Sequence, residues 1–192
     1  MKAGVLALQG AFREHREALD ALGVDTVEVR TPDDLSCVET LFLPGGESTT
    51  MTKLVDSSRL RAPLADRIAA GLPVFATCAG LILLARDVLD GRPDQESLGV
   101  LDVTVRRNAY GRQRESFEAP LEVDGLPGGA FPGVFIRAPV VETAGDAVDV
   151  LATYDDHPVL VRSGAIWAAT FHPELSGDLR LHRRFLDETG GN

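Results

Sequence analysis

Residues 73–84 read PVFATCAGLILL, a short apolar strand that breaks at Cys78 and continues as an apolar helix. A tight strand-to-helix turn of this kind is a nucleophile elbow, which exposes its nucleophile at the top of a sheet. The helix that follows directs backbone N–H groups toward the thiol, and its positive end favours the thiolate. The run therefore predicts an α/β sheet with a reactive cysteine at the carboxyl end of one strand.

A second run, FHPE at residues 171–174, supplies a base in His172 and a carboxylate in Glu174 that can orient it. Taken alone, a cysteine in an apolar run is more often a small buried hydrophobe, and His-Pro-Glu is often only a turn. Their joint occurrence, with two small residues directly after the cysteine, favours catalysis. We interpret Cys78, His172 and Glu174 as a triad for acyl transfer.

Size and composition restrict the remaining possibilities. The chain has 192 residues, of which 44% are hydrophobic, and we expect one compact domain spanning residues 1–192. We find no apolar stretch of roughly 18 residues and no signal-peptide layout, and only two cysteines, so a reducing, cytoplasmic setting is expected. Cys37 has no elbow around it and is interpreted as structural. The formal net charge of −10 disfavours nucleic acid and anionic membranes as partners.

The order of predicted elements indicates the architecture. Strands are expected at 2–8, 26–29, 40–44 and 74–77, and helices at 12–22 and 57–70, the second capped by Ser57. Further strands are expected at 98–106, 116–123, 134–137, 148–154, 159–162 and 165–171, before a final helix from Asp178. This alternation predicts an α/β fold with a central mixed, mostly parallel sheet flanked by helices, and an antiparallel extension.

Three notable segments follow strands of the predicted sheet. They are Gln9-Gly10, the GGES run at residues 45–48, and Cys78. Ligands of open α/β sheets bind beyond the carboxyl ends of the strands, so these segments are expected to meet at one site. The remaining histidines, at positions 15, 157 and 182, are interpreted as surface or helix-face residues without a chemical role.

The sequence resembles the class I, or triad-type, glutamine amidotransferases, which have a flavodoxin-like fold. Within that group it is similar to the glutaminase subunits of pyridoxal phosphate synthase. The resemblance spans nearly the whole chain, through LQGA at 8–11, LPGGESTT at 43–50, TCAGL at 77–81, RN at 107–108, GRQ at 111–113, SFE at 116–118, VFIRAP at 134–139 and FHPEL at 171–175. One departure is Ala76, where the family's elbow usually has glycine; alanine fits if its φ angle is negative.

The resemblance implies a glutaminase reaction through a thioester. Cys78 would attack the side-chain amide carbon of L-glutamine, His172 would carry the proton to the departing ammonia, and Glu174 would orient the imidazole. The backbone N–H groups of Gly46 and Ala79 would receive the oxyanion.

The family pattern also maps residues that hold the substrate. These contacts fall on Gly46, Glu47, Ser48, Arg107, Ile136 and Arg137. An arginine suits the glutamine α-carboxylate because its planar fork donates two parallel hydrogen bonds, and Glu47 suits the α-amino group. Arg106 and Arg107, taken without the resemblance, would be solvated edge charges.

By the same resemblance, the partner is a synthase subunit with a TIM-barrel fold, within a large hetero-oligomeric complex, which takes up the ammonia through an internal path. No cofactor and no metal are expected in this chain's own catalytic step. Two alternatives stay open: another class I glutaminase, and a non-enzymatic regulatory subunit on the same fold. A cysteine hydrolase or chaperone of the related flavodoxin-like group is a third, although such proteins lack the distal His-x-Glu arrangement.

Overall fold

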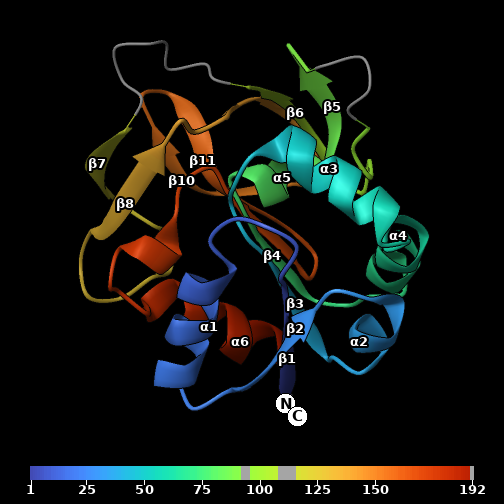
Figure 1. The fold of residues 1–192 in the computed structure, drawn as a ribbon. Coiled ribbons are helices and arrows are strands. Elements are labelled where there is room, and N and C mark those ends of the chain that lie inside the picture. Colours follow the sequence, from blue (N-terminus) through green and yellow to red (C-terminus); the bar gives the residue numbers. More distant parts are fainter. Residues whose placement is uncertain (92–95, 108–115, 191–192) are drawn as a thin grey trace.

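The computed structural model describes residues 1–91, 96–107 and 116–190. Within them, a seven-stranded sheet runs through the centre in the order β10-β11-β12-β4-β3-β1-β2 (Figure 1). Its strands are β1 (Lys2–Leu6), β2 (Asp25–Val29), β3 (Thr40–Leu43), β4 (Val74–Thr77), β10 (Asp149–Tyr154), β11 (His157–Ser163) and β12 (Ile166–Ala169). Strands β12 to β2 pair in parallel, and β10 and β11 add antiparallel pairs at one edge. The expected mixed sheet with an antiparallel extension is confirmed.

Helices cover both faces of this sheet (Figure 1). They are α1 (Phe12–Ala21), α2 (Pro32–Ser36), α3 (Ser48–Ser57), α4 (Arg61–Ala69), α5 (Ala79–Leu84), the 3-10 helix η1 (Pro173–Leu175) and α6 (Arg180–Thr189). Because side chains alternate along a strand, Phe42 and Phe75 join one apolar cluster with α1 and α6, whereas Leu43 and Ala76 join another with α2 to α5. The strands are therefore buried on both sides, as a parallel sheet requires.

Two smaller sheets complete the described part of the fold. Strands β5 (Ala85–Leu89), β6 (Leu101–Arg106) and β9 (Val140–Ala144) form one, and the hairpin of β7 (Ser116–Leu121) and β8 (Phe131–Ile136) forms the other. Strands β5 and β9 were not predicted from the sequence. The β5 residues follow the apolar helix α5 without a turn signal, so their pattern looks like its continuation.

The prediction of one helix over residues 57–70 is wrong about where that helix begins. The structure has two helices there, and Ser57 is the last residue of α3 rather than a cap. The two helices are separated by a short turn at Arg59, which has a φ angle of 60°. Helix α3 was missed because its N-cap is Glu47, in a run that otherwise reads as a loop; its carboxylate accepts the N–H groups of Thr49 and Thr50.

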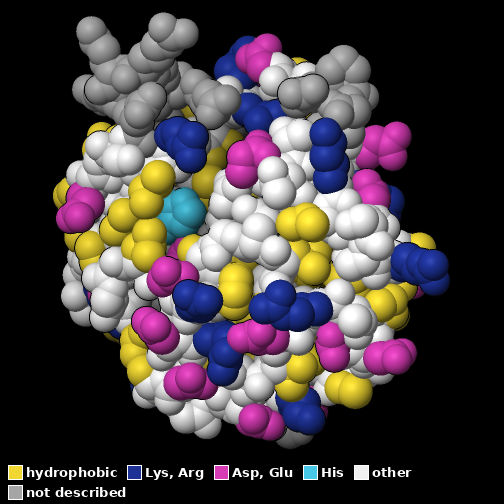
Figure 2. Space-filling view, in the orientation of Figure 1, with side chains coloured by type: hydrophobic (Ala, Val, Ile, Leu, Met, Phe, Trp, Pro, Cys, Tyr) yellow, Lys and Arg dark blue, Asp and Glu magenta, His cyan; other side chains and the backbone are white. Residues whose placement is uncertain are grey.

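Charged side chains of both signs are mixed over the face drawn in Figure 2. Among the described residues, ion pairs join Arg16 to Glu28 at 2.5 Å and Arg30 to Glu28 at 2.9 Å. Among the helices of the described residues, none is long and apolar enough to cross a membrane.

Candidate active site

Cys78 lies at a sharp turn between β4 and α5. Its backbone angles, φ 47° and ψ −100°, are unusual for a residue with a side chain and indicate stored strain, which proteins tend to place at functional sites. A Cβ atom on Gly80 would overlap the carbonyl oxygen of Leu43, so glycine is needed for the turn to pack against β3. Ala76 belongs to β4 and has no positive φ, so the condition for alanine there is met. The predicted elbow geometry is present.

His172 and Glu174 lie next to one another in the turn after β12. His172 Nδ1 is 2.7 Å from Glu174 Oε1, and both side chains are buried. The backbone N–H of His172 donates to the carbonyl of Val134 on β8 at 2.8 Å. Alternation along a strand would also place residues two apart on one face, but β12 ends at Ala169, and the turn through η1 brings the pair together.

Electrostatics couple the imidazole to both neighbours. Burial by itself would lower the pKa of His172, but hydrogen bonds with Cys78 and Glu174 outweigh it and raise the pKa to about 10. Burial likewise would raise the pKa of Glu174, yet the electrostatic attraction of the nearby His15 ring, together with the hydrogen bond and charge of His172, keeps it lowered. A charged imidazole beside a thiol favours the thiolate, which is the form that attacks carbonyl carbon.

A pocket of about 200 Å³ opens at this point of the sheet. It is lined by Gly46, Glu47, Ser48, Cys78, Ile82, Arg107, Ile136, Arg137 and His172. All six residues predicted as substrate contacts therefore line the same pocket as Cys78 and His172. Drug-sized ligands occupy pockets of roughly 300–1,000 Å³, so this volume suits a ligand as small as an amino acid. Ile82, from the buried helix α5, also lines the pocket, and no sequence pattern had identified it as a pocket residue.

The model of the SNO glutamine amidotransferase family matches this chain over residues 5–190. The chain belongs to that family. A pyridoxal 5'-phosphate synthase subunit PdxT of Frankia alni is 56% identical over 186 residues, covering 97% of this chain and 94% of the relative. A protein of the same name from Thermotoga maritima is 55% identical over 187 residues, covering 97% and 98% respectively.

Solved structures agree with this assignment. One described as a glutamine amidotransferase superposes with a TM-score of 0.92 at 53% identity, covering 98% of this chain and 99% of its own. Another glutamine amidotransferase, from Thermotoga maritima, reaches a TM-score of 0.63 at 12% identity, covering 98% and 83%, and shows the shared fold alone. The predicted glutamine amidotransferase fold is confirmed.

In this glutamine amidotransferase, the loop after β3 is held by the loop after β1. The Ala11 N–H donates to the Gly45 carbonyl at 3.0 Å, and Gln9 Oε1 accepts from the Glu47 N–H at 3.1 Å. The expectation that Gln9-Gly10 lies beside Gly45-Gly46 is confirmed. Because the C=O and N–H of a trans peptide point in opposite directions, the Gly46 N–H is directed away from the start of α1.

Charged residues of the amidotransferase pocket differ in their surroundings. Both oxygens of Glu47 cap α3; although burial would raise its pKa, hydrogen bonds from Thr50 and Thr49 lower it to about 2. Arg107 Nη2 lies 3.6 Å from Glu47 Oε1. Its neighbour Arg106 points elsewhere and pairs with acidic side chains of β9 and of the residue after β5, as an edge charge would.

Arg137 is the other pocket arginine, and its backbone is strained, with a φ angle of 43°. It is exposed, and its guanidinium makes no ion pair with another residue of the described part of the chain. A strained residue whose charge is not used internally is suited to a ligand. The neighbouring family runs at Asn108 and at residues 111–113 lie outside the described residues.

The interpretation of two histidines as surface residues is wrong. His15 and His182 are fully buried behind the triad, and His15 Nε2 lies 3.5 Å from Glu174 Oε2. Their helices are amphipathic, but the polar pair faces inward, and a contact 167 positions apart in sequence leaves no local signal.

Cys37, interpreted as structural, is exposed at the end of α2. Across the described ranges, no group of three or more His, Cys, Asp or Glu side chains is arranged to hold a metal ion.

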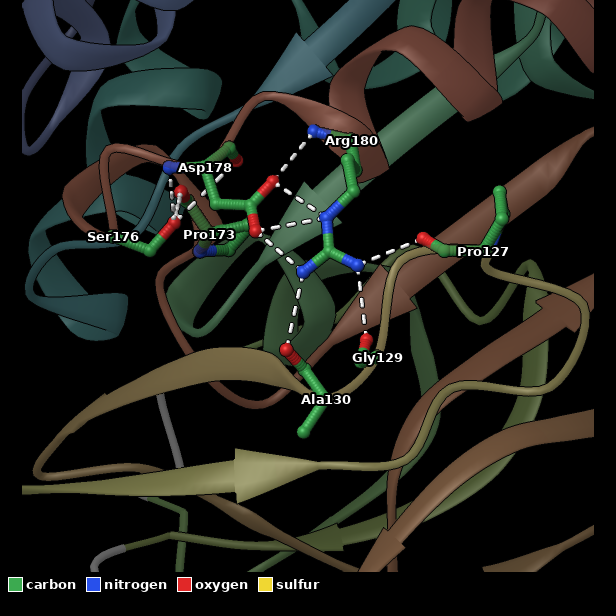
Figure 3. Close-up of polar contacts among 7 residues, drawn as sticks. All are labelled: Pro127, Gly129, Ala130, Pro173, Ser176, Asp178 and Arg180. Atoms are coloured by element: carbon green, nitrogen blue, oxygen red, sulfur yellow. Dashed lines mark hydrogen bonds and ion pairs between the residues drawn. The ribbon is translucent and has the colours of Figure 1, made fainter.

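Arg180, at the start of α6, joins Asp178 to the segment that precedes β8 (Figure 3). Its guanidinium pairs with Asp178 at 2.6 Å and donates to the carbonyls of Pro127, Gly129 and Ala130 at 2.8, 2.9 and 3.1 Å. The segment 127–130 leads directly into β8, whose last residue, Ile136, lines the pocket. These contacts fix the start of β8 relative to the start of α6, and no local sequence pattern predicts them.

Proposed function

We propose that this chain hydrolyses L-glutamine to L-glutamate and ammonia through a Cys78–His172–Glu174 triad, as the glutaminase subunit of pyridoxal 5'-phosphate synthase. The family match and the PdxT relatives support the assignment. The observation that carries it is that one pocket gathers Cys78, His172 and all six proposed substrate contacts. The proposed catalytic domain spans residues 1–192.

The first half-reaction forms the thioester. The Cys78 thiolate attacks the side-chain amide carbon, and the negative charge that develops on the amide oxygen is received by the N–H groups of Gly46 and Ala79. The carbon–nitrogen bond then breaks, and the protonated His172 donates its proton to the departing nitrogen, which leaves as ammonia. Glu174 keeps the imidazole oriented and stabilises its charged form.

The second half-reaction restores the enzyme. His172, now neutral, takes a proton from a water molecule as that water attacks the thioester carbon. The carbon–sulfur bond breaks, glutamate is released, and Cys78 returns to the thiolate beside a charged His172. The pKa of His172, raised to about 10, favours a charged imidazole at neutral pH.

Substrate orientation comes from the other end of the pocket. The guanidinium groups of Arg107 and Arg137 are proposed to hold the α-carboxylate of glutamine, for which an arginine fork is well shaped. Glu47, whose lowered pKa keeps it charged, is proposed to attract the α-amino group while still capping α3. Ser48 and Ile136 complete the walls on either side.

The ammonia is proposed to pass to a synthase subunit with a TIM-barrel fold, which binds at the mouth of this pocket in the cytoplasm. Ammonia released into water would be lost, so coupling to an acceptor gives the reaction its use. We further propose that docking reshapes the Gln9-Gly10 and Gly45-Gly46 loops and completes the oxyanion hole, a gating role common for loops.

The direct test is ammonia release from glutamine by the purified chain, alone and with the synthase subunit. We expect slow hydrolysis alone and faster hydrolysis in the complex. No release under either condition, with glutamine binding retained, would favour the non-enzymatic alternative. Release that is coupled to a different acceptor enzyme would favour another class I glutaminase.

A further inference from the structure

Behind the triad, a second buried layer connects Glu174 to α1 and α6. Glu174 Oε1 bonds His172, but the side chain's other oxygen, Oε2, is buried without a hydrogen bond in the described residues. His15 Nε2 lies 3.5 Å from this oxygen and 3.2 Å from Thr77 Oγ1. On its other side, His15 Nδ1 lies 3.1 Å from His182 Nε2. A buried carboxylate oxygen without a donor is costly, so these neighbours need an explanation.

The tautomers of the two histidines follow from what each ring nitrogen faces. Burial lowers the pKa of both His15 and His182, the latter to about 3, so each ring is neutral at pH 7 and has one N–H and one lone pair. If His15 carried its proton on Nδ1, its Nε2 lone pair would face the Glu174 carboxylate. His182 would then carry its proton on Nδ1, which is buried and has no acceptor in the described part of the chain.

The opposite choice removes both penalties. With the proton on His182 Nε2, that group donates to His15 Nδ1, and the His15 Nε2–H is left to donate toward Glu174 Oε2 and Thr77 Oγ1. Only the lone pair of His182 Nδ1 then lacks a partner, which costs less than a buried N–H without an acceptor. A separation of 3.5 Å is long for a hydrogen bond, but catalytic contacts often tighten once substrate is bound.

We propose that His15 is a positioning residue for the triad, donating its Nε2–H to the second oxygen of Glu174, with His182 fixing the tautomer that makes this possible. The expected kinetic effect of this inference rests on the proposed glutaminase function, whereas the expected tautomers of His15 and His182 do not depend on it. Held at both oxygens, Glu174 cannot rotate away from His172, and its charged form is stabilised in a site where burial opposes charge.

The charges around His15 agree with this role. Four titratable groups act on it: Glu174 from η1, His172 just before it, His182 from α6, and Glu14 on its own helix. Phe42 packs against both rings, at 5.7 Å from His15 and stacked at 5.8 Å on His182, and excludes water from the pair. His15, His182 and Thr77 are therefore fully shielded from bulk solvent.

A spectroscopic experiment on the unmodified full chain tests the structural content. The protein has four histidines, so long-range ¹H–¹⁵N spectra of the imidazole rings are simple to assign. At pH 7 we expect His15 and His182 both as neutral rings with the proton on Nε2. A His15 ring without a proton on Nε2 would overturn the proposal, whether or not the chain hydrolyses glutamine.

A pair of variants tests the consequence. His15→Leu removes the donor, whereas His15→Gln places an amide N–H near the position of Nε2. For the leucine variant we expect kcat to fall about tenfold or more with KM nearly unchanged. The acid limb of the pH profile should also move up by about one unit, because charged Glu174 loses a donor. The glutamine variant should restore both. Wild-type kinetics for the leucine variant, or equal losses in both folded variants without a pH shift, would overturn it.

Discussion

Replacing Gly10 by alanine tests how the loop after β1 supports the proposed oxyanion hole. Gly10 has a φ angle of 81°, and a Cβ atom there would overlap the carbonyl oxygen of Gly45. It would also lie 2.9 Å from the Gly45 carbonyl carbon and 3.1 Å from Gly46 Cα, both close for a Cβ contact. These are backbone atoms, so the Gly45–Gly46 peptide itself must move, and its hydrogen bond from Ala11 must break or lengthen.

The size of the effect follows from this geometry. Relieving the overlap requires a displacement on the order of 1 Å, and misplacing catalytic groups by about 1 Å can cost about 100-fold in rate. Loss of one oxyanion donor costs about 100- to 1,000-fold in kcat. The left-handed backbone adds about 1–2 kcal/mol of destabilisation for alanine. We therefore expect Gly10→Ala to lose about 100-fold in kcat and to remain folded.

Gly23 provides a matched control at the other end of α1. It has a φ angle of 74°, but a Cβ atom there would meet nothing within 4 Å. Gly23→Ala should therefore lose similar stability without losing activity. The assay is ammonia release at saturating glutamine, with and without the synthase subunit, alongside thermal unfolding of both variants. If the two variants retained equal kcat, the proposed role of the Gly45–Gly46 peptide would be refuted.

Four further predictions concern the pocket, the triad and the partner. Arg137→Ala should raise the glutamine KM about tenfold with kcat little changed, because loss of a charge-assisted contact from an exposed side chain costs an amount at the lower end of the usual range. Arg106→Ala is the control, and an equal KM in the two variants would contradict this prediction. His172→Asn should cost nearly as much as loss of the thiol, and Glu174→Gln somewhat less, up to about 10⁴-fold in kcat. The charged form of His172 stabilises the fold, fully below the ordinary pKa of 6.5, and this stabilisation is lost as the pH rises through about 10. In Glu174→Gln the same stabilisation should be lost at a lower pH, as measured by thermal unfolding across the pH range. Saturating synthase subunit should raise kcat, and equal rates with and without it would remove the activation hypothesis.

Local patterns predicted the parts of the site that depend on a few adjacent residues. The elbow at Cys78 follows from a strand, a cysteine and two small residues in sequence, and the central strands follow from apolar runs between turns. The convergence of the loops after β1, β3 and β4 follows from a general rule of parallel sheets. The His172–Glu174 contact does not come from strand alternation, because β12 ends at Ala169 and the short turn through η1 also places residues two apart on the same side.

Contacts between residues far apart in the chain could not be predicted from local sequence patterns. His15 was interpreted as exposed since polar residues on amphipathic helices usually face water, and its partner His182 lies on a helix at the other end of the chain. Likewise, Arg180 donates to three backbone carbonyls of a loop, and no pattern of side chains predicts such contacts. Helix α3 was missed because Glu47 was considered only as a substrate contact, whereas in the structure its side chain caps the helix.

The central claim is that Cys78 forms a covalent bond with the glutamyl group of glutamine. Rapid acid quenching of the complex during turnover, followed by peptide mass spectrometry, measures this directly. We expect one γ-glutamyl adduct, on Cys78, formed and lost at the rate of ammonia release and absent from Cys78→Ala. Ammonia release by Cys78→Ala at the parent rate, or an adduct mainly on the exposed Cys37, would contradict the account.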